Sequence, residues 1–212
     1  MAVEQVPRTD LARLVARGQA LAGKGGRRLL GIAGSPGSGK STLAAEVTEA
    51  LGELAVLVPM DGFHLAQAQL EALGIADRKG AIDTFDCGGF AHLLGRLKAA
   101  DEPVVYAPAF RRDLEEPIAG AVAVPAGVPL VVVEGNYLLA EGGGWERVRP
   151  LLDEVWFLLP DESVRLDRLI ARHMAFGRDR TGAEERSLGS DQVNADLIAR
   201  TSGRADVLVT GC

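Results

Sequence analysis

The residues that most clearly indicate chemistry form a short run rich in glycine. This run matches the pattern G-x-x-x-x-G-K-[ST] and consists of Gly34, Ser35, Pro36, Gly37, Ser38, Gly39, Lys40 and Ser41. Such glycines let the backbone curl around phosphate oxygens with its N–H groups pointing inward, and the start of a following helix adds positive potential. We therefore predict a nucleotide phosphate site in which Lys40 reaches the β- and γ-phosphates, Ser41 binds Mg²⁺ and Thr42 assists at the α-phosphate. A glycine-rich turn that binds nothing is the alternative.

Two carboxylates follow apolar runs that are typical of buried strands. Asp61 comes after the run 54–58, and Glu134 comes after the run 129–133. In an open parallel sheet, ligands bind outside the carboxyl ends of the strands, so both side chains are expected to face the nucleotide. We predict that Glu134 forms the second arm of the metal site. We predict that Asp61 orients an acceptor hydroxyl and takes its proton during phosphoryl transfer. The alternatives are an exposed acid at a strand end for Glu134 and a turn residue for Asp61.

A series of arginines lies in the C-terminal third of the chain. Arg165, Arg168 and Arg172 are spaced by three and four residues, which places them on one face of a predicted helix, and Arg178 follows in a polar segment. Arginines that close over a transferring phosphoryl group stabilise its charge and help to exclude water. We predict that Arg172 and Arg178 are catalytic, together with Lys40 and Asp61, and that Arg165 is a surface residue. A solvated helix face paired with nearby acids is the alternative.

Alternating helical and strand patterns predict an α/β fold whose mostly parallel five-stranded sheet carries helices on both faces and an Arg-containing lid. The expected helices are residues 10–21, 41–51, 65–73, 90–99, 163–176 and 191–199. The expected strands are residues 28–33, 54–58, 129–133, 154–159 and 206–209, with a further short strand at 104–105. We expect one domain spanning residues 1–212, in which 1–26 contain the leading helix and about 177–190 form the lid.

Composition and charge argue against several classes of protein. The formal net charge of -6 disfavours a nucleic-acid partner, since binding to a phosphate backbone needs clustered Lys and Arg. The most apolar stretch, 121–133, is interrupted by Pro125 and Pro129 and is too short to cross a membrane. Cys87 and Cys212 are far apart in sequence and make neither a disulfide framework nor a metal cluster. Without a signal-peptide pattern at the N-terminus, we expect a cytoplasmic protein. The oligomeric state stays open, with a homodimer as one candidate.

Taken together, these segments resemble the uridine kinase, pantothenate kinase and phosphoribulokinase group of P-loop kinases. The chain looks closest to a nucleoside/nucleotide-kinase-like branch labelled fructose transport system kinase. The matching segments are 31–42, 60–64, 84–86, 133–139, Arg172-His173 with Gly177, and 191–195. The Asp-Gly-Phe-His run at 61–64 and the Glu-Gly-Asn-Tyr run at 134–137 are much more specific than the phosphate loop, which identifies only the superfamily.

The resemblance implies a P-loop NTPase fold and an ATP- and Mg²⁺-dependent kinase that phosphorylates a hydroxyl of a sugar, a nucleoside or a pantothenate-like metabolite. It implies that Asp61 lies at the acceptor hydroxyl, that Glu134 is the metal-side carboxylate, and that Arg172 and Arg178 are lid arginines. The residues expected to contact the acceptor are Asp61, His64, Arg111, Asn136 and Tyr137. The expected partners are ATP and this small molecule.

The sequence disfavours two other classes of P-loop protein. A nucleotide-switched regulator that hydrolyses ATP or GTP without an acceptor is disfavoured, because the chain has no Asn-Lys-x-Asp guanine motif. The ATP-binding module of a transporter is disfavoured because the Leu-Ser-Gly-Gly-Gln signature is absent.

Overall fold

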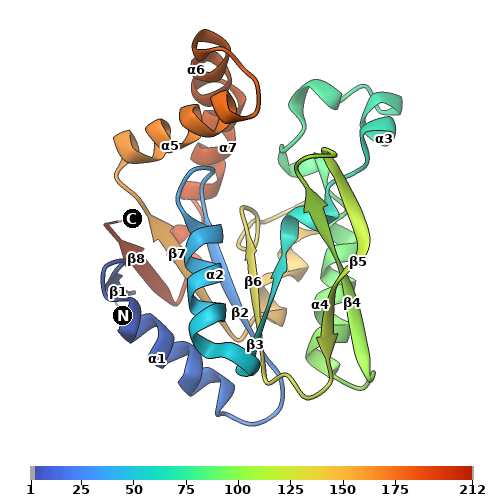
Figure 1. The fold of residues 1–212 in the computed structure, drawn as a ribbon, viewed down its shortest axis with the longest axis vertical. Helices are drawn as coiled ribbons and strands as arrows, with labels where there is room; N and C mark the ends of the chain where they lie inside the picture. Colours follow the sequence, from blue (N-terminus) through green and yellow to red (C-terminus); the bar gives the residue numbers. More distant parts are fainter. Residues whose placement is uncertain (1–2, 212) are drawn as a thin grey trace.

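A parallel β-sheet forms the centre of the computed structural model, which describes residues 3–211. Its strand order is β1-β8-β7-β2-β6-β3, and every neighbouring pair is parallel (Figure 1). The strands are β1 (Glu4–Pro7), β2 (Arg28–Gly34), β3 (Ala55–Pro59), β6 (Leu130–Gly135), β7 (Glu154–Leu159) and β8 (Val207–Thr210). The five predicted strands are confirmed, but the predicted strand count was wrong because β1 adds a sixth at the edge beside β8. With only four residues, β1 has too short a pattern to be recognised.

Seven α-helices surround or overhang this sheet within the described part of the chain. They are α1 (Leu11–Ala22), α2 (Lys40–Leu51), α3 (Gln67–Ala72), α4 (Cys87–Ala99), α5 (Glu162–Ala175), α6 (Arg180–Leu188) and α7 (Ser190–Ala199). Single 3₁₀ turns connect them at η1 (Gly52–Leu54), η2 (Met60–Phe63), η3 (Ala76–Arg78), η4 (Ile82–Thr84), η5 (Trp145–Arg147), η6 (Arg149–Leu151) and η7 (Ser202–Arg204). None of these helices has the length and apolar character that spanning a bilayer requires.

Helices cover both faces of the sheet, as predicted, because its central strands are apolar on both sides. Successive side chains of a strand point to opposite faces. In β6, Leu130 and Val132 therefore pack into the core beneath α1 and α2, whereas Val131 and Val133 pack into a second core that contains the buried face of α4. This double burial explains why 129–133 reads as a continuous apolar run rather than an alternating one.

A β-hairpin stands beside the β3 edge of the main sheet. Strands β4 (Val104–Arg111) and β5 (Glu116–Pro125) pair antiparallel and form a separate two-stranded sheet (Figure 1). The short predicted strand at 104–105 is only the start of β4, and β5 was not predicted. Most of β5 is exposed, and after Glu116 it contains only apolar residues and one Gly, so it lacks the alternation of apolar and polar residues that marks a half-buried strand.

Helices α5, α6 and α7 form an arm above the carboxyl ends of the strands (Figure 1). The polar segment 177–190, the predicted lid, contains α6 rather than only loop. Asp179 caps this helix, since its carboxylate accepts a hydrogen bond from the backbone N–H of Gly182 at 2.8 Å. Of the two cysteines, Cys87 carries a free thiol, and Cys212 lies outside the described residues.

The contact between η2 and β4 allows a test of how closely the fold holds Asp61. A Cβ at Gly62 would lie 2.3 Å from the backbone oxygen of Pro108, an atom that cannot rotate away. We expect Gly62→Ala to lower the free energy of unfolding by about 1–3 kcal/mol, measured by urea denaturation. Gly95→Ala in α4 is the matched control, because a Cβ at Gly95 meets nothing within 4 Å and Ala favours a helix by about 0.5–1 kcal/mol. Equal effects of the two substitutions would contradict this account.

Candidate active site

The glycine-rich run connects β2 to α2, in the strand–loop–helix arrangement that the sequence predicts. Gly34 ends the strand, and Lys40 begins the helix. Gly37 and Gly39 have φ values of +82° and +88°, a left-handed backbone that other residues rarely adopt. A Cβ at Gly37 would lie 2.6 Å from the carbonyl oxygen of Arg165, so α5 packs directly on this phosphate loop.

Opposite charges are buried together where the loop enters α2. The exposed fraction is 9% for Lys40 and 5% for Glu134. Burial lowers the pKa of Lys40, while the charge of Glu134 opposes this shift. Burial likewise raises the pKa of Glu134, and Asp61 raises it further. The three groups therefore share one electrostatic environment, in which each carboxylate favours the charged lysine.

The same corner of the site presents oxygen atoms suited to Mg²⁺. The Ser41 hydroxyl donates a hydrogen bond to the Glu134 carboxylate over 3.1 Å. Mg²⁺ prefers such oxygen ligands and usually combines one or two protein groups with phosphate oxygens and water. The hydroxyl of Ser38 in the loop is buried and has no hydrogen-bond partner among residues 3–211, which is consistent with a group that binds a ligand. These residues fit a bound Mg²⁺–nucleotide.

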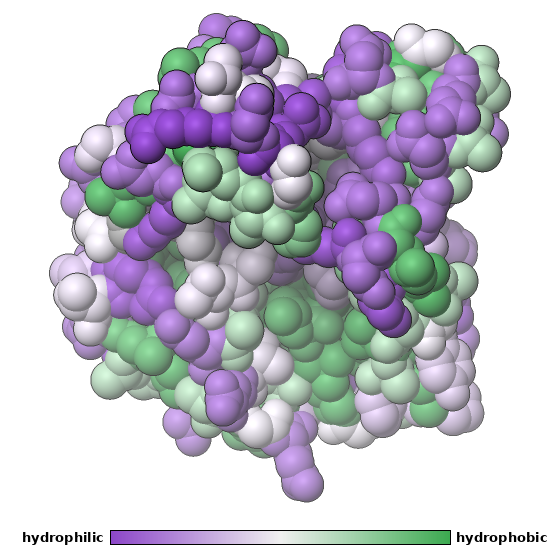
Figure 2. Space-filling view, turned by 45° about the horizontal axis from the view of Figure 1, so that its top comes forward, coloured by the Kyte–Doolittle hydropathy of each residue, from purple (hydrophilic) through white to green (hydrophobic). Residues whose placement is uncertain are grey.

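A cavity of about 560 Å³ opens next to the phosphate loop. Figure 2 shows the molecule hollowed between the α5–α7 arm and the opposite wall, with hydrophilic side chains gathered along the hollow. The cavity contains Pro36, Lys40 and Ser41 from the phosphate loop. Its other polar and charged lining residues are Asp61, His64, Asp77, Lys79, Arg112, Glu115, Asn136, Arg172, His173, Arg178, Arg186, Asp191 and Asn194.

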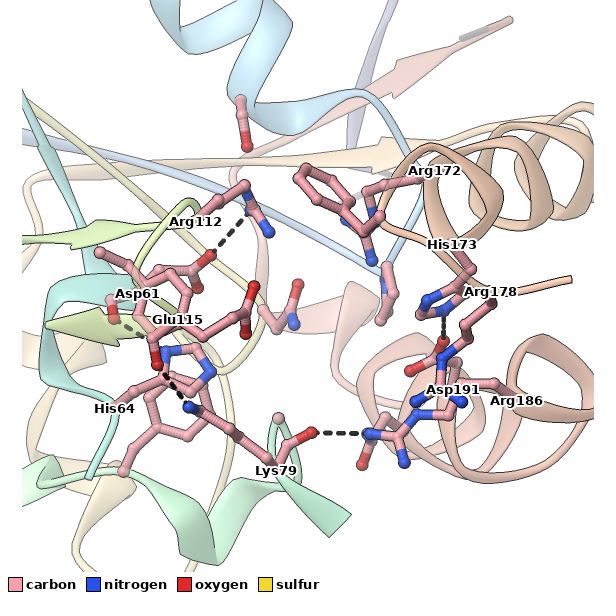
Figure 3. A pocket seen from close by; sticks show the side chains of 18 of the residues that line it. Asp61, His64, Lys79, Arg112, Glu115, Arg172, His173, Arg178, Arg186 and Asp191 are labelled. Atoms are coloured by element: carbon pink, nitrogen blue, oxygen red, sulfur yellow. Dashed lines mark hydrogen bonds and ion pairs between the residues drawn. The ribbon is translucent and has the colours of Figure 1, made fainter. Parts of the chain in front are cut away.

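Two groups of side chains face each other across this cavity (Figure 3). One group, the acceptor wall, consists of Asp61, His64, Lys79, Arg112 and Glu115. The other belongs to the arm and consists of Arg172, His173, Arg178, Arg186 and Asp191. Asp61 lies in η2 just beyond the end of β3, and its carboxylate is 3.4 Å from a guanidinium nitrogen of Arg112.

His64 is held in a defined orientation on the acceptor wall. Its Nδ1 lies 2.8 Å from the backbone carbonyl oxygen of Asp61, and its ring rests against Phe85 and Phe110 at centroid distances of 4.0 and 4.8 Å. A carbonyl oxygen can only accept, so Nδ1 carries the proton. Burial lowers the pKa of His64, which favours the neutral ring and leaves Nε2 as an acceptor.

Three other predicted acceptor contacts lie in different surroundings. Asn136 lines the cavity, and its Oδ1 is buried without a hydrogen-bond partner in the described part of the chain. Tyr137 instead points into the core and donates a hydrogen bond from its hydroxyl to the Gly80 carbonyl at 2.7 Å, while burial raises its pKa. Arg111 pairs with Asp113 on the surface, and the cavity receives Arg112 in its place.

The arginines of the arm divide into a structural and a cavity-facing set. The prediction that Arg165 is a surface residue was wrong, because its side chain is only 2% exposed. Its guanidinium donates to the Pro36 carbonyl at 3.1 Å, which fixes α5 to the phosphate loop. Arg172 and Arg178 both line the cavity, as their predicted role requires. Burial lowers the pKa of Arg172, and its guanidinium has no hydrogen-bond partner in the described part of the chain.

Arg186 connects the two sides of the cavity. From α6 it donates hydrogen bonds to the backbone carbonyls of Asp77 and Lys79, at 2.9 and 2.8 Å (Figure 3). Sequence reasoning missed Arg186 and Lys79, because no recognised motif contains them, and in the segment 110–113 it selected Arg111 rather than Arg112. Arg111 ends β4, whereas Arg112 is the first residue of the following turn, and the sequence alone does not show which of the two faces the cavity.

The remaining predicted residues belong to the phosphate loop and the first turn of α2, and they lie away from the large cavity. Thr42, Ser38 and Gly39 line a smaller hollow of about 170 Å³ together with Arg8 and Arg168. Ser35 is buried beneath the loop, and its hydroxyl donates to the Ala195 carbonyl at 3.4 Å.

Comparison with known proteins gives consistent matches. The model of the phosphoribulokinase / uridine kinase family matches residues 29–211. The ATP-dependent kinase-like protein notR′ of Aspergillus versicolor is 36% identical over 161 residues, which cover 72% of this chain and 94% of that protein. Protein YggC of Escherichia coli (strain K12) is 32% identical over 189 residues, which cover 86% of this chain and 77% of that protein. A crystal structure from Silicibacter sp. TM1040, assigned provisionally as a fructose transport system kinase, has a TM-score of 0.84 and 37% identity, covering 93% of this chain and 98% of that one.

The buried His64 predicts a specific dependence of stability on pH. Its pKa is lowered in the folded state from an ordinary value of 6.5, so the unfolded chain binds more protons below about pH 6.5. The free energy of unfolding therefore falls as pH falls through this range. We expect His64→Asn, which retains an N–H donor for the Asp61 carbonyl, to lose less stability than the wild type between about pH 7.5 and about pH 5 in urea denaturation. An identical pH dependence of the two proteins would contradict a buried neutral ring.

Proposed function

This chain belongs to the phosphoribulokinase / uridine kinase family of P-loop, ATP-dependent kinases, and we propose that it transfers the γ-phosphoryl group of ATP to a hydroxyl of a small metabolite. One observation carries this proposal: the carboxylate of Asp61 lines the same cavity as Lys40 and Ser41 of the phosphate loop. A protein that only binds nucleotide does not need a carboxylate that faces the phosphates from an open wall. The acceptors that the cavity would take are sugars, nucleosides or pantothenate-like alcohols.

The chemical step follows from the placement of these groups. The acceptor hydroxyl oxygen forms a bond to the γ-phosphorus while the bond between that phosphorus and the β–γ bridging oxygen breaks. Asp61 takes the hydroxyl proton, and ADP leaves with the bridging oxygen. Lys40 stabilises the negative charge on the β- and γ-phosphates throughout, and its burial keeps this charge away from competing water.

Ser41 and Glu134 would hold the metal ion of the nucleotide. When bound, Mg²⁺ neutralises charge on the phosphate oxygens and fixes their orientation. The hydrogen bond between the two side chains keeps both oxygens at one position before the ligand arrives. This preorganisation reduces the entropy that must be lost on binding.

The segment 177–190 and the end of α5 would act as a lid. Arg172 and Arg178 reach the cavity from this arm and would stabilise charge on the transferred group. His173 and Asp191, which form a pair at 2.6 Å, brace α5 against α7 beside them. Arg186 would hold the lid on the acceptor wall, so water is kept from the γ-phosphate while the acceptor is bound.

Loss of the Asp61 carboxylate tests the proposal directly. We expect Asp61→Asn to lower kcat for acceptor phosphorylation by about 10²- to 10⁴-fold, since an amide cannot take the proton. The measurement is ADP production in a coupled assay with Mg-ATP, without acceptor and then with sugars, ribonucleosides, pantothenate and sugar phosphates in turn. Binding of ATP, followed by calorimetry, should change little in this variant and should weaken strongly in Lys40→Ala.

An unchanged turnover in Asp61→Asn would remove that residue from the chemistry. If, in addition, no acceptor raised ADP production above the basal rate, a nucleotide-hydrolysing regulatory protein would replace the kinase as the better account.

The bridge made by Arg186 generates a second expectation. We expect Arg186→Ala to increase the ratio of inorganic phosphate to phosphorylated acceptor, because a loosened lid admits water to the γ-phosphate. Arg180→Ala is the matched control, since Arg180 lies on the same helix and pairs only with the nearby Glu184. Both products can be quantified by ³¹P NMR. A ratio that stays at the wild-type value in Arg186→Ala would show that this contact does not seal the site.

A further inference from the structure

The acceptor wall carries a lysine without an acidic partner. The ammonium group of Lys79 donates to the backbone carbonyl of Glu115 at 2.6 Å and lies 3.5 Å from the amide oxygen of Gln67. It also stands 5.3 Å from the centre of the Phe110 ring. Within residues 3–211 it forms no ion pair at 4 Å or less. A positive charge beside a cavity with only neutral partners retains its attraction for an anion.

Arg112 supplies a second positive charge to the same wall. Its single ionic contact, with Asp61, is long at 3.4 Å and uses one nitrogen, and its side chain is 48% exposed. A guanidinium has five N–H donors, so most of its capacity is free for a ligand. Figure 3 shows Arg112 and Lys79 on either side of His64. Burial lowers the pKa of that histidine, and the charges of both residues lower it further, which agrees with their placement around the ring.

The positively charged side chains on the opposite side of the cavity would bind the phosphates of ATP rather than the acceptor. Lys40 lies in the phosphate loop, and Arg172 and Arg178 lie in the arm above it, where the triphosphate of ATP would neutralise them. Lys79 and Arg112 stand across the cavity with Asp61, on the acceptor side. Lys79 contacts the Glu115 carbonyl and the Phe110 ring, away from the phosphate loop, so ATP bound at that loop does not supply the anion that Lys79 lacks. The charge of Arg112 also acts on Lys40 and Arg172, whose pKa values it lowers, so Arg112 stands between Lys79 and the phosphate loop.

Other atoms of the wall limit what the rest of the acceptor can be. The carboxylate of Glu115 and the side chain of Asn136 both line the cavity and can form hydrogen bonds with hydroxyl groups. The packed rings of His64, Phe85 and Phe110 add a small, largely apolar surface to the same lining. These features suit a compact compound with several hydroxyl groups.

We propose that the acceptor carries a carboxylate or a phosphate, bound between Lys79 and Arg112, and presents a hydroxyl to Asp61. This inference rests on the proposed function, because it assigns the substrate class of that same site. It excludes neutral sugars and free nucleosides as preferred acceptors. It also assigns Lys79 and Arg112 to the selection of substrate, a role separate from that of the lid arginines.

The test uses pairs of compounds that differ in one anionic group: pantothenate and pantothenol, ribose 5-phosphate and ribose, and uridine 5′-monophosphate and uridine. We expect the charged member of at least one pair to be preferred by about tenfold or more in kcat/KM, as a charge-assisted hydrogen bond provides. Lys79→Met and Arg112→Gln should each remove most of this preference, chiefly by raising KM. Arg78→Gln removes the same charge from the neighbouring position, where Arg78 pairs with Asp83 outside the cavity, and should leave the preference unchanged. The pair that responds distinguishes a carboxylate from a phosphate.

Equilibrium binding of the same compounds, measured by calorimetry in the presence of Mg²⁺ and a non-hydrolysable ATP analogue, separates the two proposals. Neutral members that are phosphorylated as well as the charged ones would overturn the anionic acceptor and leave the kinase intact. Charged members that bind through Lys79 and Arg112 without being phosphorylated would overturn the kinase and support the anion site. No selective binding and no selective turnover, or a preference for cationic compounds through Glu115, would overturn the anion site.

Discussion

The burial of Lys40 beside Glu134 is the constraint on which the rest of the site depends. A buried charge is costly unless an opposite charge lies nearby, and the charge of Glu134 favours the charged form of Lys40, although the two groups form no ion pair at 4 Å or less within residues 3–211. The register of β2 and β6 brings them together, because Ile32 lies opposite Glu134 and the chain then curls through the phosphate loop into α2. The proximity of the two residues at the carboxyl ends of the central strands is therefore a product of sheet pairing.

Two arginines connect the sheet end of the site to the helical arm and the opposite wall of the cavity: Arg165, which is buried, and Arg186, which bridges the cavity. Arg165 ties the first turns of α5 to the carbonyl of Pro36, so the base of the arm moves with the phosphate loop. Arg186 joins the far end of the arm to carbonyl groups beside Lys79. One helical arm therefore joins the phosphate loop to the opposite wall of the cavity, and both connections are already formed in this structure.

Much of the fold and the phosphate half of the site could be predicted from the sequence, because strong local patterns encode them. The loop motif defines Lys40 and Ser41, and the apolar run before Glu134 defines its strand. The acceptor wall is different, since Lys79, Arg112 and Glu115 come from turns and a hairpin that become neighbours only through tertiary packing. Arg165 shows the opposite error: its charge suggests a surface position, yet carbonyl groups and Glu162 satisfy it within the structure. Strand β5 was not predicted because most of it is exposed, and β1 was not predicted because four residues are too few to show a pattern of alternating burial.

Transfer of an intact phosphoryl group to an alcohol is the central claim of this account. The most direct measurement incubates the enzyme with Mg²⁺, a metabolite extract and ATP labelled with ¹⁸O on the three terminal oxygens of its γ-phosphate, and follows the label by mass spectrometry. The account predicts a phosphate ester that carries all three labelled oxygens, with its bridging oxygen unlabelled because that atom comes from the acceptor hydroxyl. If every extract tested gave the label only in inorganic phosphate, with no labelled ester, the account would be contradicted.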